Sequence, residues 1–143
     1  MKEETDARWL LRYGSYAKAL SKILEVVESG RTMSDLSDLE KEGLVQRFEY
    51  AFELAWKTLQ DLLIYRGYEI TPGPNYVLRK SFEDGLITDH DGWRKMAKAR
   101  NITTHTYDEE DAAEIVQNIY DNYAGLFKEL DYILKKQEDF KQL

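Results

Sequence analysis

The 143-residue sequence predicts an all-α protein, an antiparallel four- or five-helix bundle that forms a single domain over residues 1–143. Apolar residues recur at steps of three and four over three long stretches, which is the spacing of a buried helical face. Glycine, proline and capping residues separate these stretches, and the alternation typical of β-strands persists nowhere. The links are short, which favours antiparallel neighbours.

Two long helices are expected in the first half of the chain. The first covers residues 6–29 and stops at Gly30. Its apolar stripe comprises Trp9, Tyr13, Tyr16, Leu20, Ile23, Leu24 and Val27. The second helix begins after Ser37, because Ser37 and Glu40 match a capping box, and it runs to about Arg66. It carries aromatic residues on more than one side, so it lies at the centre of the bundle or against a second chain.

Two shorter helices are expected next. Pro74 suits the first turn of a helix over about residues 74–84, which Gly85 closes. Asp89 or Asp91 then caps a fourth helix, and the lone His90 between them is interpreted as an exposed loop residue.

The last long helix is expected over residues 109–137, with Asp108 as its N-cap and acidic residues in its first turn. An uninterrupted helical period places one stripe toward the core. That stripe comprises Ala112, Ile115, Ile119, Tyr123, Leu126, Leu130 and Ile133.

Composition excludes several classes of function. The net charge of −7 argues against bulk electrostatic attraction to nucleic acid, and the absence of cysteine excludes disulfides and thiol chemistry. The N-terminus lacks the apolar core of a secretory signal, and no apolar run approaches the ~20 residues of a membrane span. We therefore expect a soluble, cytoplasmic protein. The sequence has no glycine-rich phosphate loop, no Ser-His-Asp arrangement and no zinc-ligand spacing, so no cofactor or metal is expected.

The stretch from Arg100 to Tyr107 gathers the most reactive side chains of the chain, including one of its two histidines. Arginine offers a fork of donors that matches phosphate oxygens, and histidine exchanges protons near neutral pH. Arg100 and His105 are therefore candidates for cleaving a phosphodiester without a metal. By spacing alone, such a pair also occurs by chance in many helical proteins.

Helical geometry brings only part of this stretch together. Asn101 and His105 share a helix face, whereas Arg100 points about 140° away from His105 at 3.6 residues per turn. Thr103 and Thr104 favour an end of the helix here, which would let His105 turn toward Arg100.

Charged residues are unevenly spread around this stretch. A basic segment of Arg94, Lys95, Lys98 and Arg100 precedes it, and an acidic segment of Asp108, Glu109, Glu110 and Asp111 follows it. Each is either part of a local ion site or a solvated helix face, and the solvated face is favoured for each run alone. Glu49 and Glu53, one helical turn apart, are likewise interpreted as a solvated face rather than as ligands of a hard cation.

Three blocks in this order resemble the nucleotidyltransferase-substrate-binding family, which belongs to the wider HEPN group of helical proteins. The blocks are Arg47 to Lys57, Ser81 to Ile87, and Arg100 to Tyr107 with Asp108 and Glu109 after it. The third block is the most specific, because it fits the Arg-x4-His-x-Tyr form of HEPN toxins.

The resemblance implies a homodimeric toxin, a metal-independent endoribonuclease paired with a minimal nucleotidyltransferase as antitoxin. In this reading, Arg100 holds the scissile phosphate of RNA, His105 serves as general base or acid, and Asn101 orients His105 or the phosphate. Tyr107 is the position that the partner adenylylates, which silences the toxin. The alternative is a non-catalytic substrate-binding subunit of a two-chain nucleotidyltransferase. A third possibility is a structural bundle in which Arg100 and His105 only cap helix ends.

Overall fold

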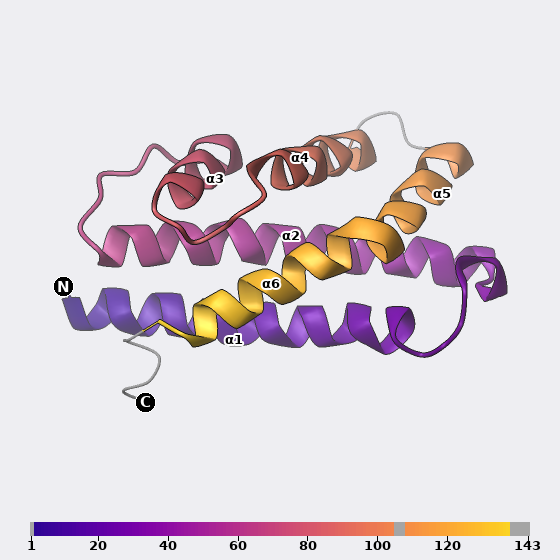
Figure 1. The fold of residues 1–143 in the computed structure, drawn as a ribbon, viewed down its shortest axis with the longest axis horizontal. Coiled ribbons are helices and arrows are strands. Elements are labelled where there is room, and N and C mark those ends of the chain that lie inside the picture. The colour runs from indigo at the N-terminus through magenta and orange to yellow at the C-terminus, as the bar shows by residue number, and fades with distance from the viewer. Residues whose placement is uncertain (1, 105–107, 138–143) are drawn as a thin grey trace.

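The computed structural model describes residues 2–104 and 108–137, with side chains from residue 8 onward. Within these ranges every regular element is helical, which confirms the all-α bundle, and none of the helices is long and apolar enough to cross a membrane. The elements are α1 (Lys2–Val27), a 3₁₀ turn η1 (Met33–Asp35), α2 (Asp38–Tyr65), α3 (Pro74–Glu83), α4 (His90–Thr104), α5 (Glu109–Asn118), a π-helical turn η2 (Ile119–Tyr123) and α6 (Ala124–Lys135). Figure 1 shows α1 and α2 lying antiparallel, with α3 and α4 along α2 and α6 crossing α1.

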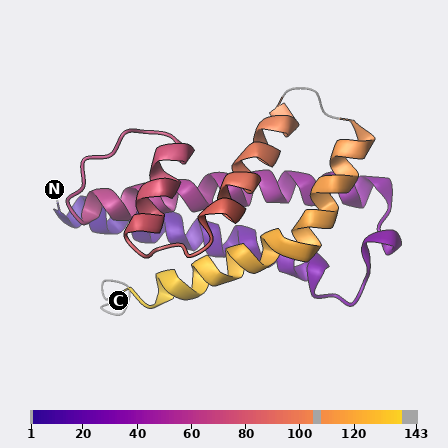
Figure 2. The same cartoon turned by 45° about the horizontal axis from the view of Figure 1, so that its top comes forward.

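Helix α2 lies at the centre of the bundle, where it packs against α1, α3, α4 and α5 (Figure 2). It begins with the expected capping box: the Glu40 backbone N–H donates to Ser37 Oγ at 3.1 Å, and the Ser37 N–H donates to Glu40 Oε1 at 2.9 Å. This central position accounts for the aromatic residues on several of its sides. Tyr50 is the exception, because it remains 61% exposed.

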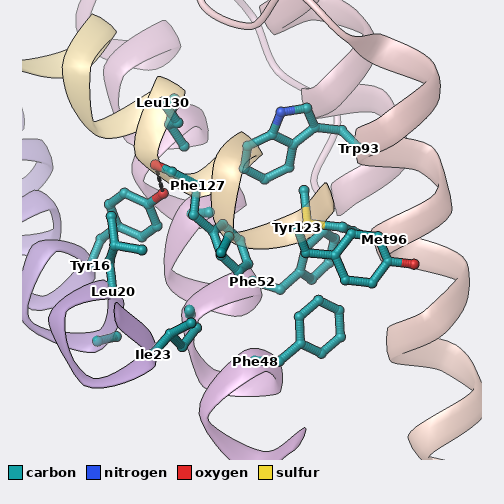
Figure 3. Packing of buried hydrophobic residues seen from close by; sticks show 14 of the residues in the cluster. Tyr16, Leu20, Ile23, Phe48, Phe52, Trp93, Met96, Tyr123, Phe127 and Leu130 are labelled. Atoms are coloured by element: carbon teal, nitrogen blue, oxygen red, sulfur yellow. Dashed lines mark hydrogen bonds between the residues drawn. The ribbon is translucent and has the colours of Figure 1, made fainter. Parts of the chain in front are cut away.

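Aromatic side chains from four helices form the core (Figure 3). Phe48 of α2 stacks on Tyr123 with ring centroids 5.2 Å apart, and Trp93 of α4 meets Phe127 edge-on at 5.8 Å. The buried hydroxyl of Tyr16 donates to the carbonyl oxygen of Phe127 at 2.7 Å, which satisfies a polar group that would be costly to bury unpaired. These contacts fix α1, α4 and α6 around α2.

The C-terminal helix departs from the expected pattern at η2. A π-helical turn accommodates one extra residue, so the face that follows it is shifted in phase. Consequently Phe127 and Leu134 are buried, whereas the predicted Leu126 and Ile133 are only half-buried. The prediction of one stripe to Ile133 was therefore wrong for Leu126 and Ile133, whereas Leu130 is buried as predicted. Figure 2 shows the change of direction between α5 and α6.

The short helices follow the expected bounds closely. Pro74 is the first residue of α3, and Gly85 after it has a φ of +78°, a conformation that glycine adopts without strain. Asp89 caps α4, since its Oδ1 accepts the Gly92 N–H at 2.9 Å. His90 is not an exposed loop residue: it is the first residue of α4, it is half-buried, and it stacks on Phe82 with centroids 5.4 Å apart.

The phase shift at η2 predicts that Leu134 contributes more to the free energy of unfolding than its neighbour Ile133. Leu134→Ala should lower the free energy of unfolding by about 3 kcal/mol, because Leu134 is fully buried. Ile133→Ala should cost less than about 1.5 kcal/mol, because that side chain is only half-buried. Urea denaturation of both variants measures the difference, and a larger loss for Ile133→Ala would contradict the π-helical phase.

Candidate functional site

Helix α4 delivers the first part of the Arg100–Tyr107 stretch. Its inner face is anchored in the core by Trp93 and Met96, which are 1% and 0% exposed. The helix is described as far as Thr104. The predicted helix end falls where residues 105–107 lie outside the described part of the chain, so it stays a prediction. Arg100 and Asn101 therefore sit shortly before the last described residue of a helix whose orientation is fixed by packing.

Arg100 is directed toward α2, where two carboxylates hold it. Its Nη1 atom lies 3.1 Å from Glu49 Oε2, and its Nε atom lies 3.5 Å from Glu53 Oε1. Thr103 joins this cluster, because its hydroxyl donates to Glu49 Oε2 at 2.8 Å. The side chains of Arg100, Glu49 and Glu53 are 23%, 26% and 34% exposed, so water screens the ion pairs only in part.

The ion pairs with α2 do not use every N–H donor of the Arg100 guanidinium. Its buried Nε–H group makes no hydrogen bond to any described residue, although Glu53 Oε1 lies near. The side chain of Arg100 as a whole is 23% exposed, so part of it meets solvent, where a guanidinium can donate to an external anion.

Asn101 does not share the environment of Arg100. It is exposed and lines a groove between α3 and α4, on another face of the helix. Successive residues of a helix point about 100° apart, which explains why the two side chains separate. The structure thus does not bring Asn101 into the cluster around Arg100.

His105 and Tyr107 lie outside the residues that the structure describes. Their assignment as proton-transfer residue and adenylylation position stays a prediction. The described chain resumes at Asp108, which caps α5 as expected: its Oδ1 accepts the Asp111 N–H at 2.9 Å.

Glu49 and Glu53 are the site residues that sequence reasoning missed. Their interpretation as a solvated face was wrong, because both approach Arg100 and both are partly buried. The available signal was their i,i+4 spacing on α2, which places two negative charges side by side and calls for a cation between them. That cation comes from a residue about 50 positions later, which no local pattern reveals.

Comparison with known proteins identifies relatives of this chain. The sequence model of a family described as nucleotidyltransferase substrate binding protein like matches residues 11–136. A curated protein of Haemophilus influenzae named Probable ribonuclease HepT is 34% identical over 83 residues, which are 55% of this chain and 57% of that protein. The chain therefore spans little more than half the length of this relative.

The fold also has a counterpart of known structure. A crystal structure of a protein from Thermus thermophilus matches with a TM-score of 0.71 and 32% sequence identity. The match covers 85% of this chain and 99% of that protein.

The pairing of Arg100 with α2 predicts a measurable coupling energy. A double-mutant cycle with Glu49→Gln and Arg100→Gln should give a favourable interaction of about 1 kcal/mol in thermal or urea unfolding. A matched cycle at Asp91 and Lys95, an exposed pair 3.3 Å apart on α4, should give less than about 0.5 kcal/mol. Equal couplings in the two cycles would show that the cluster does not constrain Arg100.

Proposed function

We propose a function from the premise that the chain belongs to the nucleotidyltransferase substrate binding protein like family. The protein is a metal-independent endoribonuclease of the HEPN type and acts as the toxin of a toxin–antitoxin pair. Its similarity to a probable ribonuclease supports this proposal. The observation that carries it furthest is Arg100, held on one side by α2 while part of its side chain remains exposed to solvent and to an anion.

The proposed reaction uses the 2′-hydroxyl of RNA as its nucleophile. His105 accepts the proton of the 2′-hydroxyl, and the 2′-oxygen attacks the adjacent phosphorus. The bond from phosphorus to the 5′-oxygen breaks, and that oxygen receives a proton from an imidazolium. Arg100 stabilises the negative charge that builds on the non-bridging oxygens. The products are a 2′,3′-cyclic phosphate and a free 5′-hydroxyl, and no metal is required for the balance.

A homodimer supplies both proton-transfer groups in this proposal. One histidine acts as base while a second, from the partner protomer, acts as acid, as the resemblance to HEPN proteins implies. A twofold axis near the end of α4 would place two copies of Arg100 and His105 in one groove. The second guanidinium would also offset the surplus negative charge that Glu49 and Glu53 bring to Arg100.

The proposed antitoxin is a minimal nucleotidyltransferase that adenylylates Tyr107. A nucleotide on this phenol, two residues from His105, adds bulk and negative charge where the RNA phosphate binds. Like-charge repulsion and steric exclusion would then block the substrate without unfolding the bundle.

Cleavage of RNA by the purified protein in the presence of a chelator tests the proposed activity. The wild type should produce fragments with cyclic phosphate ends, and His105→Ala should lower the rate at least ~100-fold because proton transfer is lost. Lys128→Gln, an exposed substitution on α6, is a matched control for folding and should cleave like the wild type. Cleavage by His105→Ala at the wild-type rate would contradict the proton-transfer role of His105. If the wild type cleaves no RNA, the protein is not a ribonuclease.

A second candidate is a non-catalytic subunit that presents substrate to a nucleotidyltransferase chain. Two observations favour it: the description of the family, and the two carboxylates that already occupy one side of Arg100. Both candidates predict binding to a nucleotidyltransferase, so binding alone does not separate them.

Growth on expression separates the two candidates. The ribonuclease should arrest growth, and Arg100→Ala or a co-expressed cognate nucleotidyltransferase should restore it. Intact mass of the co-expressed protein should then show added AMP, which Tyr107→Phe should abolish. Normal growth with the wild-type chain alone would favour the substrate-binding subunit instead.

A further inference from the structure

A groove of about 600 Å³ runs between α3 and α4, on the face of α4 turned away from the Arg100 cluster. Figure 2 shows the two helices side by side. Basic side chains from both helices line this groove: Arg79 from α3, and Arg94, Lys95 and Lys98 from α4. Its lining contains a single carboxylate, Asp91.

Three of these cations have no acidic partner. Asp91 pairs with Lys95 at 3.3 Å, whereas Arg79, Arg94 and Lys98 make no ion pair or hydrogen bond with any side chain of the described ranges. All three are exposed. Arg79 is held in place from one side, since its guanidinium lies 5.2 Å from the centroid of the Tyr76 ring.

The unpaired Arg79 and Arg94 differ from most other arginines of the described residues, in a chain whose net charge is −7 over all 143 residues. Other arginines of the described chain lie 2.7–3.8 Å from a carboxylate oxygen: Arg12, Arg31, Arg47, Arg66 and Arg100. Clustered like charges repel one another, so a groove that gathers three cations whose only neighbouring carboxylate, Asp91, pairs with Lys95 becomes more favourable when an anion enters it. The groove therefore has the charge of a site for a polyanion rather than of a solvated helix face.

We propose that the α3–α4 groove binds the phosphate backbone of single-stranded RNA. Arg94 and Lys98 are four residues apart on one face of α4, which separates them by about 6 Å along the helix axis. This rise is comparable to the spacing of successive phosphates along an extended strand. Arg79 faces them from α3, so that cations border the strand on both sides. Arginine and lysine contacts of this kind recognise the backbone without reading its sequence.

The groove leads toward the proposed reaction centre, and this inference rests on the proposed ribonuclease function. Asn101 lines the groove and directly follows Arg100, three residues before the last described residue of α4, Thr104. A strand held by Arg94 and Lys98 would pass Asn101 as it reaches the end of the helix. Asn101 then contacts the strand, although it lies outside the cluster around Arg100.

Binding of a non-cleavable RNA tests the groove separately from catalysis. The probe is a fluorescent 2′-O-methyl oligouridine, which lacks the 2′-hydroxyl needed for cleavage, and the readout is anisotropy over a range of salt concentrations. The double variant Arg94→Gln/Lys98→Gln should bind at least ~10-fold more weakly than the wild type. Its slope of log affinity against log salt should fall by about 1.4, because each phosphate contact on a single strand contributes about 0.7.

A matched control removes the same charge from another face. Lys128 and Lys135 on α6 are both paired, with Glu28 at 2.7 Å and with Asp131 at 3.0 Å. Lys128→Gln/Lys135→Gln should keep the affinity within about twofold of the wild type and leave the salt slope unchanged. All four positions are exposed on helices, where glutamine is tolerated.

Three results would overturn the proposal: no RNA binding by the wild type, equal affinities for the groove and control variants, or loss of binding that tracks a loss of oligomer mass in light scattering. The last would assign the groove to a contact between copies of the chain. If the groove variants weaken RNA binding but the wild type cleaves no ordinary RNA, the ribonuclease proposal is refuted and the RNA-binding groove stands. If the wild type cleaves RNA but the groove variants bind it as tightly as the wild type does, the groove proposal is refuted and the ribonuclease stands.

Discussion

The ion pair between Arg100 and Glu49 is the contact on which the proposed site depends, because it joins the end of α4 to the central helix α2. Glu49 and Glu53 lie one turn apart, and two carboxylates at that spacing repel each other unless a cation lies between them. Arg100 is that cation. The aromatic core fixes the axis of α4, and the carboxylates then determine which way the guanidinium points. The exposed part of the Arg100 side chain, which is 23% exposed as a whole, is left for a ligand.

Charge is distributed so that an acidic protein still offers places for an anion. Five arginines of the described chain, Arg12, Arg31, Arg47, Arg66 and Arg100, pair with carboxylates. Arg79 and Arg94, which do not, line the groove between α3 and α4, and Arg100 lies farther along α4. The net charge of the protein therefore does not predict whether this groove attracts an anion, because the electrostatic potential in a groove depends on the charged residues that line it.

The sequence predicted those parts of the fold that depend on local physical chemistry. Ser37 and Asp108 cap helices as their side chains dictate, and the stripe of α1 is buried from Trp9 to Ile23. The π-helical turn was not predictable from the apolar period, because the same residues fit an uninterrupted helix up to Tyr123. Only the burial of Phe127 and Leu134 in place of their neighbours reveals the extra residue.

The site was predictable only in part for a similar reason. Local spacing identified Arg100 as a candidate, but Glu49 reaches it from α2 across the tertiary fold. His90 was assigned to a loop because its flanking aspartates resemble a turn, whereas Asp89 caps a helix and Phe82 provides a stacking surface. Partners that come from distant segments are set by packing, and the sequence does not encode them as a pattern.

The most direct measurement of the central claim is the rate of RNA cleavage by Glu49→Ala and Glu49→Gln, compared at equal folded fraction. If Glu49 positions Arg100 for the transition state, Glu49→Ala should lower kcat on the order of 100-fold with little change in KM. Glu49→Gln, which keeps an oxygen acceptor near Arg100, should recover part of that loss. A folded Glu49→Ala protein with the kcat of the wild type would contradict the account.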